Sequence, residues 1–398
     1  METVIDNLLS DVAVEVDGIN RKLRLNWSGS ESTEFHYVWL RHHAQCPDGL
    51  PNDTSIKIDL VPDDPASLVI DDCKIIDEHL EITWGDRDLK TTHPLTALIS
   101  FRYDSIGRKR RKPAPVLWSS DTAVPIPCYP YSDLQDQASL LQISLAIRDF
   151  GIVRIKKVPV IPGTVAKVAE HFGVVHRNNY GDVFDVKSDA HMALGSNTGK
   201  HLGPHTDESY RHAAPGITFF HCLRTSADGG GASILVDGFN AAKCLRDRTP
   251  NLFRTLTDVP VFFQRRSLPE EDMQSHRRMI TLDIDGDVEG IRFTDRTLPP
   301  QDLPDNLIED TYKAIKAFWR IINSNDLKVE YLMVSGDLHI FDNQRVLHGR
   351  TEFYPAKGER HLQQCSVNRD EFHNTIRTLA ARTDDPAQSQ TMAGGALA

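Results

Sequence analysis

Short apolar segments separated by turn residues dominate the first hundred residues of the chain. Residues 22–27 and 80–84 alternate between apolar and polar side chains, and 67–70 form a short, mostly apolar run. Alternation with a period of two, bounded by turn residues, is typical of β-strands that bury one face. The pattern predicts a small, mostly antiparallel β domain over residues 1–103.

The spacing of apolar residues changes after residue 131. Leucines and isoleucines at near-helical spacing predict a helix between 134 and 147, and similar patterns predict helices at 165–172 and 306–324. The strand-like segments of this region are 152–155, 217–220, 232–236, 259–263, 337–341 and 362–367. This order indicates an α+β fold built around an antiparallel barrel or sandwich over residues 131–384.

Two segments lack such periodicity. Residues 104–130 carry a basic run at 108–112 and several prolines, a composition that favours a linker wrapped on the surface. Residues 385–398 are rich in Ala, Gly, Ser and Gln, and we expect them to be disordered.

Composition narrows the class of protein. The 398 residues include 45 Lys+Arg and 56 Asp+Glu, for a net charge of −11, and such an acidic balance disfavours nucleic-acid and anionic-membrane partners. No apolar run is long enough to span a bilayer, and the first residues lack the basic and apolar pattern of a secretory signal. The six cysteines form no C-x-x-C pair, so neither a disulfide framework nor a zinc ribbon is indicated. We expect a cytoplasmic protein.

Three residues have the types and order of an iron-binding triad. His205 and Asp207 form a His-x-Asp pair on a segment expected to be extended, where side chains two apart share a face, and His348 follows a strand-like run far downstream. Two imidazoles and one carboxylate can form a facial triad that leaves three positions of Fe(II) open. His205, Asp207 and His348 are therefore the candidate metal ligands.

A candidate anion clamp accompanies the triad. Arg360 follows His348 at the start of the next strand-like segment, and its planar guanidinium is suited to holding a carboxylate through two hydrogen bonds. Upstream, a run of glycines at 229–231 leads to Ser233, whose hydroxyl is a second candidate donor. A metal triad with such a clamp is chemically complete for binding 2-oxoglutarate.

The order of His205, Asp207, Gly-Gly-x-Ser233, His348 and Arg360 resembles the taurine-dioxygenase-like superfamily of Fe(II)- and 2-oxoglutarate-dependent oxygenases. The longer strings at 236–239, 342–350 and 360–362, with Val-Trp-Leu-Arg at 38–41, are similar to its γ-butyrobetaine and trimethyllysine dioxygenase branch over nearly the whole chain. The resemblance implies a double-stranded β-helix (jelly-roll) core with flanking helices. It also implies Fe(II), 2-oxoglutarate and O2 as cofactor and co-substrates, and a homodimer.

One departure from that branch concerns its structural zinc. The branch binds zinc in its N-terminal domain through three cysteines and a histidine, whereas the corresponding residues here read Ala44, Cys46, Gly49 and Asp88. A single thiol cannot supply a tetrahedral site, so we expect no structural zinc. The role left for this domain is packing or dimerisation.

A second departure concerns the substrate pocket. The branch holds a trimethylammonium group in an aromatic cage through cation–π attraction. The resemblance implies that Tyr180 and Phe184 keep two of the cage aromatics, whereas other cage positions have become Ser196, Glu208 and Ser366. Tyr210 compensates from nearby, and Asn197 completes the implied substrate-binding set. We therefore expect hydroxylation of an aliphatic C–H bond in a small quaternary-ammonium zwitterion, such as 2-(trimethylammonio)ethylphosphonate or a betaine.

Two alternative functions fit the same residues. A sulfonate- or aryloxyalkanoate-type dioxygenase would take a substrate without a cationic group and would need neither the aromatic pair nor the N-terminal domain. A non-catalytic 2-oxoglutarate-binding sensor would keep Arg360 but lose a member of the triad. Tyr180 and Phe184, four residues apart, also fit a simple core stripe.

Overall fold

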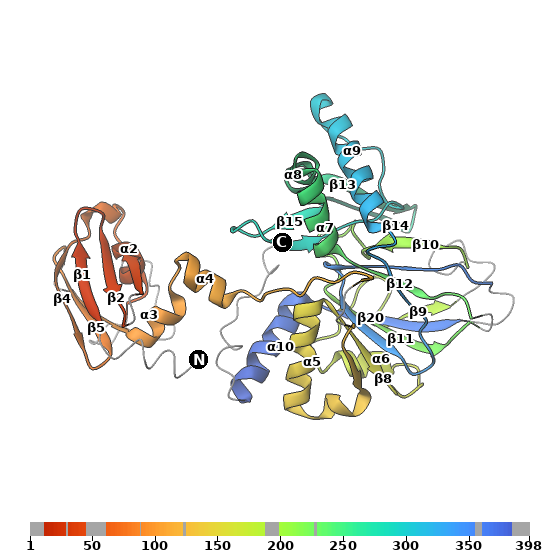
Figure 1. Cartoon of the computed structure of the whole chain (residues 1–398), viewed down its shortest axis with the longest axis horizontal. Coiled ribbons are helices and arrows are strands. Elements are labelled where there is room, and N and C mark those ends of the chain that lie inside the picture. Colours follow the sequence, from red (N-terminus) through yellow and green to blue (C-terminus); the bar gives the residue numbers. More distant parts are fainter. Residues whose placement is uncertain are drawn as a thin grey trace. The chain divides into compact units, whose positions relative to one another are not determined.

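The structure, a computed structural model, divides into two compact units, Met1–Lys112 and Pro113–Ala398 (Figure 1). It describes residues 12–28, 31–44, 61–87, 89–121, 125–187, 199–226, 229–354 and 360–383. Cys46, Gly49 and Asp88, at the positions compared with the zinc ligands, and the tail at 385–398 lie outside these ranges. Within the described residues, no helix has the length and apolar character needed to cross a membrane.

The N-terminal unit contains two three-stranded antiparallel sheets. Their strands are β1 (Ala13–Asp17), β2 (Lys22–Asn26) and β3 (Ser32–His36) in one sheet, and β4 (Ile70–Ile76), β5 (His79–Trp84) and β6 (Leu89–Pro94) in the other. The helices are α2 (Tyr37–His42), η2 (Pro65–Ser67), α3 (Leu95–Phe101) and α4 (Ser105–Arg111). The small N-terminal β region is thus confirmed, with α4 taking up the start of the segment expected to be a linker.

Alternation explains this unit's core. Leu23 and Leu25 of β2 are fully buried, and Arg24 between them is exposed. Leu80 and Ile82 of β5 are likewise buried, and Glu81 between them is only partly buried. The strand predicted at 67–70 is wrong in its start, because Asp64 caps the 3₁₀ turn η2 by accepting a hydrogen bond from the Ala66 amide at 2.9 Å. That turn delays β4 to Ile70.

The C-terminal unit is a mixed α+β structure. A four-stranded sheet has the order β10 (Leu202–His205), β19 (Val346–Arg350), β12 (Ser233–Asp237), β17 (Val329–Tyr331). A six-stranded sheet has the order β7 (Cys128–Pro130), β8 (Ile152–Lys156), β18 (Leu338–Asp342), β11 (Ile217–Arg224), β20 (His361–Val367), β9 (Phe184–Lys187). All neighbours are antiparallel except β7 and β8. Two hairpins pair β13 (Val261–Ser267) with β14 (Glu271–Arg277), and β15 (Ile280–Leu282) with β16 (Val288–Ile291).

Two groups of helices bury the apolar faces of these sheets. One core joins the six-stranded sheet to η3 (Tyr131–Gln135), α5 (Gln137–Phe150), α6 (Thr164–Ala169) and α10 (Arg369–Arg382). The other core contains α7 (Gly238–Arg248), α8 (Pro250–Asp258) and α9 (Asp305–Ile322) with the hairpins. Figure 1 shows α5 beside α10, and α7, α8 and α9 grouped together. The helix predicted at 306–324 is confirmed as α9, whose periodic apolar stripe packs inward.

The segment after α4 packs into the C-terminal unit instead of lying on its surface as a plain linker. Trp118 is 3% exposed, and its indole Nε1 donates to the carbonyl oxygen of Phe150 at 2.7 Å. Its backbone amide donates to Asp237 Oδ2 at 3.1 Å. Asp237 in turn pairs with the buried Arg345, which occupies the turn between β18 and β19. This packing fixes the turn that leads into the strand carrying His348.

Candidate active site

The two candidate histidine ligands face each other across neighbouring strands. His205 ends β10, His348 lies in the middle of β19, and the two residues are direct partners in the antiparallel register. Their ring centroids are 4.5 Å apart, and both side chains are buried. Pairing of the two strands therefore brings together ligands that are far apart in the sequence.

Asp207 completes the cluster from a turn, so the expectation that His205 and Asp207 share a strand face is wrong. The strand ends at His205, and the chain turns at Glu208, whose φ of 52° lies in the left-handed region. The side chain of Asn343 holds this turn: its Oδ1 accepts from the Asp207 amide at 2.8 Å, and its Nδ2 donates to the Asp207 carbonyl at 3.1 Å. Asp207 Oδ1 then lies 3.4 Å from His205 Nε2 and 3.5 Å from His348 Nε2.

The donor set and its protonation suit a divalent metal ion. Within the described residues, His205, Asp207 and His348 form the one group of three whose ligand atoms all lie within 4.8 Å of one another. His205 Nδ1 lies 3.0 Å from the Gly203 carbonyl oxygen, which can only accept, so Nδ1 carries the proton and Nε2 is free to bind metal. Burial, reinforced by His348, lowers the pKa of His205 to about 4. Burial alone would raise the pKa of Asp207, but the two imidazoles outweigh it and hold that pKa well below its usual range. A neutral imidazole and an ionised carboxylate are the forms that bind metal.

The candidate anion clamp lies in the same pocket. Arg360 and Ser233 are each 8% exposed and both line it. Burial lowers the pKa of Arg360 to about 10, which leaves the guanidinium charged at neutral pH. Gly231 has a φ of +78°, and a Cβ there would lie 3.3 Å from the Arg360 side chain. The glycine run therefore lets the backbone approach the guanidinium closely while Ser233 starts β12.

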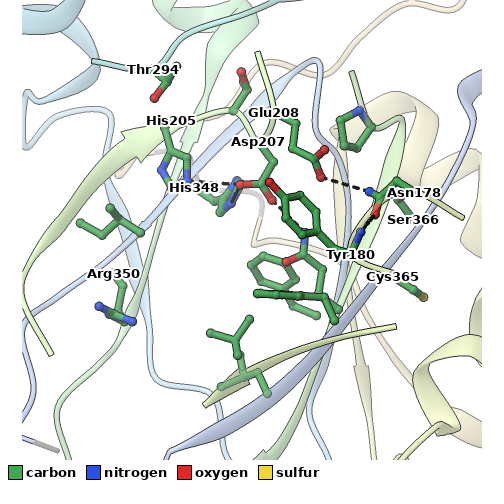
Figure 2. Close-up of a pocket in the computed structure, with 18 of the residues that line it drawn as sticks. Asn178, Tyr180, His205, Asp207, Glu208, Thr294, His348, Arg350, Cys365 and Ser366 are labelled. Carbon is green, nitrogen blue, oxygen red and sulfur yellow. Dashed lines mark hydrogen bonds and ion pairs between the residues drawn. The ribbon is translucent and has the colours of Figure 1, made fainter. Parts of the chain in front are cut away.

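The predicted aromatic residues lie together in this pocket. Tyr180 and Phe184 have ring centroids 5.9 Å apart in an edge-to-face arrangement, and Tyr210 joins them through a 3.3 Å contact between the two tyrosine hydroxyls. Glu208 and Ser366 line the same cavity, and Glu208 accepts from Asn178 at 3.4 Å (Figure 2). Ser196 and Asn197 lie outside the described residues. The described members of the predicted substrate set are thus brought together beside the triad.

A β-hairpin that sequence reasoning missed supports the aromatic wall. The Tyr180 hydroxyl donates to Glu271 Oε1 at 2.7 Å, and the other oxygen of that carboxylate accepts from Arg265 Nε at 2.9 Å. Glu271 lies on β14 and Arg265 on β13, and Arg265 also lines the pocket. Their side chains are 10% and 29% exposed, so the pair is sheltered from water. Nothing in the local sequence marks these residues, because their role depends on how the hairpin docks.

Glu208 has its own basic partner. The side chain of Arg211 is hydrogen-bonded to that of Glu208, and its guanidinium carbon lies 5.7 Å from the Tyr180 ring centroid. Burial raises the pKa of Glu208, an effect that Arg211 opposes. The carboxylates at the aromatic end are therefore each matched by an arginine.

The opposite wall of the pocket is basic and hydroxylic. In the view of Figure 2 the triad lies between Tyr180 on one side and Thr294 and Arg350 on the other. Arg296 and Thr297 line the cavity on the segment that begins with Thr294. Arg296 is exposed, and the buried Thr297 hydroxyl has no hydrogen-bond partner among the described residues. The Thr297 hydroxyl is thus a donor that the described part of the protein does not use.

Comparison with known proteins identifies the family to which this chain belongs. Residues 119–366 match the model of the taurine catabolism dioxygenase TauD, TfdA family. The match spans more than half of the chain, so the protein belongs to this family and is a non-haem Fe(II)- and 2-oxoglutarate-dependent dioxygenase with a His-Asp-His triad.

Individual relatives narrow the comparison to two kinds of dioxygenase within this family. The chain is 32% identical to γ-butyrobetaine dioxygenase of Pseudomonas sp. strain AK-1, over 89% of this chain and 93% of the relative. It is 28% identical to human γ-butyrobetaine dioxygenase, over 91% and 95% of the two chains. It is also 26% identical to trimethyllysine dioxygenase of Meyerozyma guilliermondii, over 95% and 97%. Similarity thus extends beyond the catalytic unit to nearly the whole chain.

Proposed function

We propose that the enzyme hydroxylates an aliphatic C–H bond of a small quaternary-ammonium zwitterion, with betaines and 2-(trimethylammonio)ethylphosphonate as candidates. The observation that carries the proposal is the division of the pocket. Tyr180 offers an aromatic face for a trimethylammonium group on one side of the triad, and Thr294 and Arg350 lie on the other side. Arg296 and Thr297, which follow Thr294 in the chain and also line the pocket, would serve an anionic group. The relatives γ-butyrobetaine dioxygenase and trimethyllysine dioxygenase are named for trimethylated compounds, which supports the cationic end.

Each group of side chains has a distinct task in this reaction. His205, Asp207 and His348 would hold Fe(II), while Arg360 and Ser233 would hold the distal carboxylate of 2-oxoglutarate. When bound, the metal and 2-oxoglutarate supply O2 activation, with 2-oxoglutarate converted to succinate and CO2 and one oxygen atom delivered to the substrate carbon. The protein positions the C–H bond by gripping both ends of the substrate.

Apolar residues of the six-stranded sheet complete the site. Phe220, Leu362 and Val186 line the pocket, and their apolar side chains would help to exclude water from it. We also propose that the four- and six-stranded sheets are the two walls of a double-stranded β-helix, or jelly roll. Their antiparallel pairing, and metal ligands contributed from β10 and β19, support this interpretation.

The test is succinate formation by Fe(II)-loaded enzyme across trimethylammonium carboxylates, trimethylammonium phosphonates, their neutral tert-butyl analogues and simple sulfonates. We expect one trimethylammonium class to stimulate turnover and its tert-butyl analogue to fail. Tyr180→Leu should raise the Michaelis constant for the cation about tenfold, corresponding to roughly 1.4 kcal/mol of lost cation–π attraction, and leave the Michaelis constant for the co-substrate 2-oxoglutarate unchanged.

The matched control is Tyr312→Leu, at a tyrosine of α9 that is 48% exposed and does not line the pocket. It should leave both constants unchanged. Equal stimulation by charged and neutral analogues would overturn the cationic assignment. A sulfonate without a cation that outperforms every zwitterion would instead support the sulfonate-type alternative.

A further inference from the structure

Gln364 links the substrate pocket to the metal-binding carboxylate. It lies on β20, opposite Phe220 of β11 on one side and Phe184 of β9 on the other, and its side chain lines the pocket. Its amide Nε2 donates to Asp207 Oδ2 at 2.9 Å. Gln364 therefore contacts a metal ligand from the six-stranded sheet, whereas the two histidines lie on the four-stranded sheet.

This hydrogen bond distinguishes the two carboxylate oxygens of Asp207. Oδ1 is the atom that lies 3.4 Å and 3.5 Å from the imidazole nitrogens, whereas Oδ2 is the atom held by Gln364. Asn343 fixes the backbone of Asp207 through the amide and the carbonyl, so it does not select a carboxylate oxygen. The rotation of the carboxylate about its Cβ–Cγ bond is thus restrained by Gln364.

We propose that Gln364 is a positioning residue that keeps Asp207 a single-oxygen ligand. A metal with six positions, held by two nitrogens and one oxygen, has three positions left, and 2-oxoglutarate and O2 require all three. A carboxylate free to rotate can bind through both oxygens and occupy one of those positions. The hydrogen bond to Oδ2 opposes this rotation, since the outer oxygen would have to leave its donor. The inference goes beyond the proposed function and does not depend on the identity of the substrate.

A purely structural role for Gln364 makes a different prediction. Gln363, its neighbour on β20, provides the comparison, because its side-chain amide donates to Asp185 at 3.1 Å and accepts from the Gly163 backbone amide at 2.7 Å. Both glutamines stabilise the same strand, but of the two only Gln364 is hydrogen-bonded to a metal ligand. Metal binding separates the two roles, whereas thermal stability does not.

The experiment compares Gln364→Leu and Gln364→Glu with Gln363→Leu in the full chain. Binding of Co(II), a spectroscopic probe for the Fe(II) site, is titrated without O2 through its visible absorption, and 2-oxoglutarate is then added to each metal complex. We expect both Gln364 variants to change the absorption spectrum of bound Co(II), and to weaken binding of 2-oxoglutarate to the Co(II) complex about tenfold or more, because the second oxygen of Asp207 occupies a position that 2-oxoglutarate needs. Gln363→Leu should retain the wild-type affinity and spectrum.

The proposal would be overturned by a Gln364→Leu protein whose Co(II) complex has the wild-type spectrum and the wild-type affinity for 2-oxoglutarate, whatever its melting temperature. If this variant does not fold, Gln364→Asn withdraws the amide by one methylene, and the same titration decides. Because no substrate is present, failure of the betaine assignment would leave this result unaffected. A wild-type titration with normal metal and 2-oxoglutarate binding but no turnover on any zwitterion would identify that separate failure.

Discussion

Replacing Arg345 by Met should destabilise the C-terminal unit strongly. The guanidinium forms two hydrogen bonds of 3.1 Å with the carboxylate of Asp237, and the two side chains are 2% and 0% exposed. It also donates to the carbonyl oxygens of Asp149 at 2.8 Å and Val116 at 2.7 Å. Met fills a similar volume but leaves the Asp237 charge and both carbonyls without this donor.

The magnitude follows from that geometry. Removing one partner of a buried ion pair typically costs about 3–5 kcal/mol, because the remaining charge stays buried and unpaired. At about 1.4 kcal/mol per factor of ten, the unfolding equilibrium should shift by roughly 100-fold or more. Since Arg345 occupies the turn that leads to His348, metal affinity should fall together with stability. Adding Asp237→Asn to Arg345→Met should cost less than the sum of the two single changes, as the second removes the orphaned charge.

Hydrogen exchange resolved by peptide provides the assay, since a chain of two units does not unfold as one transition. The opening free energy is measured for peptides that contain α5, β18 and β19. The matched control is Lys313→Met, which breaks an ion pair of 3.2 Å with Glu309 between exposed side chains and should change nothing measurable. A loss below about 1 kcal/mol for Arg345→Met, or one equal to the control, would refute the interpretation of the buried pair.

Three further predictions concern the pocket and the N-terminal unit. Arg360→Met should raise the Michaelis constant for the co-substrate 2-oxoglutarate by about 30-fold or more, from roughly 2 kcal/mol of charged hydrogen bonding, with little change in the constant for the substrate; comparable changes in both constants would contradict the clamp. Glu271→Gln should raise the Michaelis constant for the proposed cationic substrate several-fold, because the Tyr180 hydroxyl loses its charged hydrogen-bond acceptor; steady-state kinetics with an unchanged constant for 2-oxoglutarate would support this. Burial, with a smaller contribution from His43, lowers the pKa of His93 from 6.5 to about 4. As the pH falls, the unfolded chain is therefore protonated at this histidine before the folded one. The free energy of unfolding of the N-terminal unit should drop by of order 3 kcal/mol between about pH 6.5 and 4, and His93→Leu should remove this dependence in denaturant unfolding measured across that pH range.

The sequence predicted what depends on residue type and local period. The two histidines and the carboxylate of the triad are recognisable because few side chains bind metal, and α9 is recognisable because its apolar stripe repeats along one helix. Errors arose where a local hydrogen bond overrode the pattern. The strand predicted from residue 67 starts only at Ile70, because the Asp64 side chain caps a 3₁₀ turn. Asp207 lies in a turn and not in the predicted strand, because Asn343 is hydrogen-bonded to its backbone.

Contacts between distant residues could not be read from the sequence. Gln364 reaches Asp207 only because β20 pairs with β9 and β11 in one particular register, and a shift by one residue would point Gln363 at the metal site instead. Glu271 reaches Tyr180 only because a hairpin packs over the pocket. Such partners follow from strand register and docking, which a single sequence does not specify.

The charges around the pocket indicate which contacts would recognise the proposed zwitterion. At the aromatic end, Glu208 pairs with Arg211 and Glu271 pairs with Arg265, so the carboxylates there are already compensated. Recognition of a quaternary ammonium group must then depend on the ring faces more than on net negative charge. Arg296 differs, because it is exposed, so water screens its charge and an anion beside it gains only part of the attraction that a buried arginine would give. The anionic group of the substrate should therefore contribute more to steering and orientation, and the aromatic end more to discrimination between methylated and unmethylated amines.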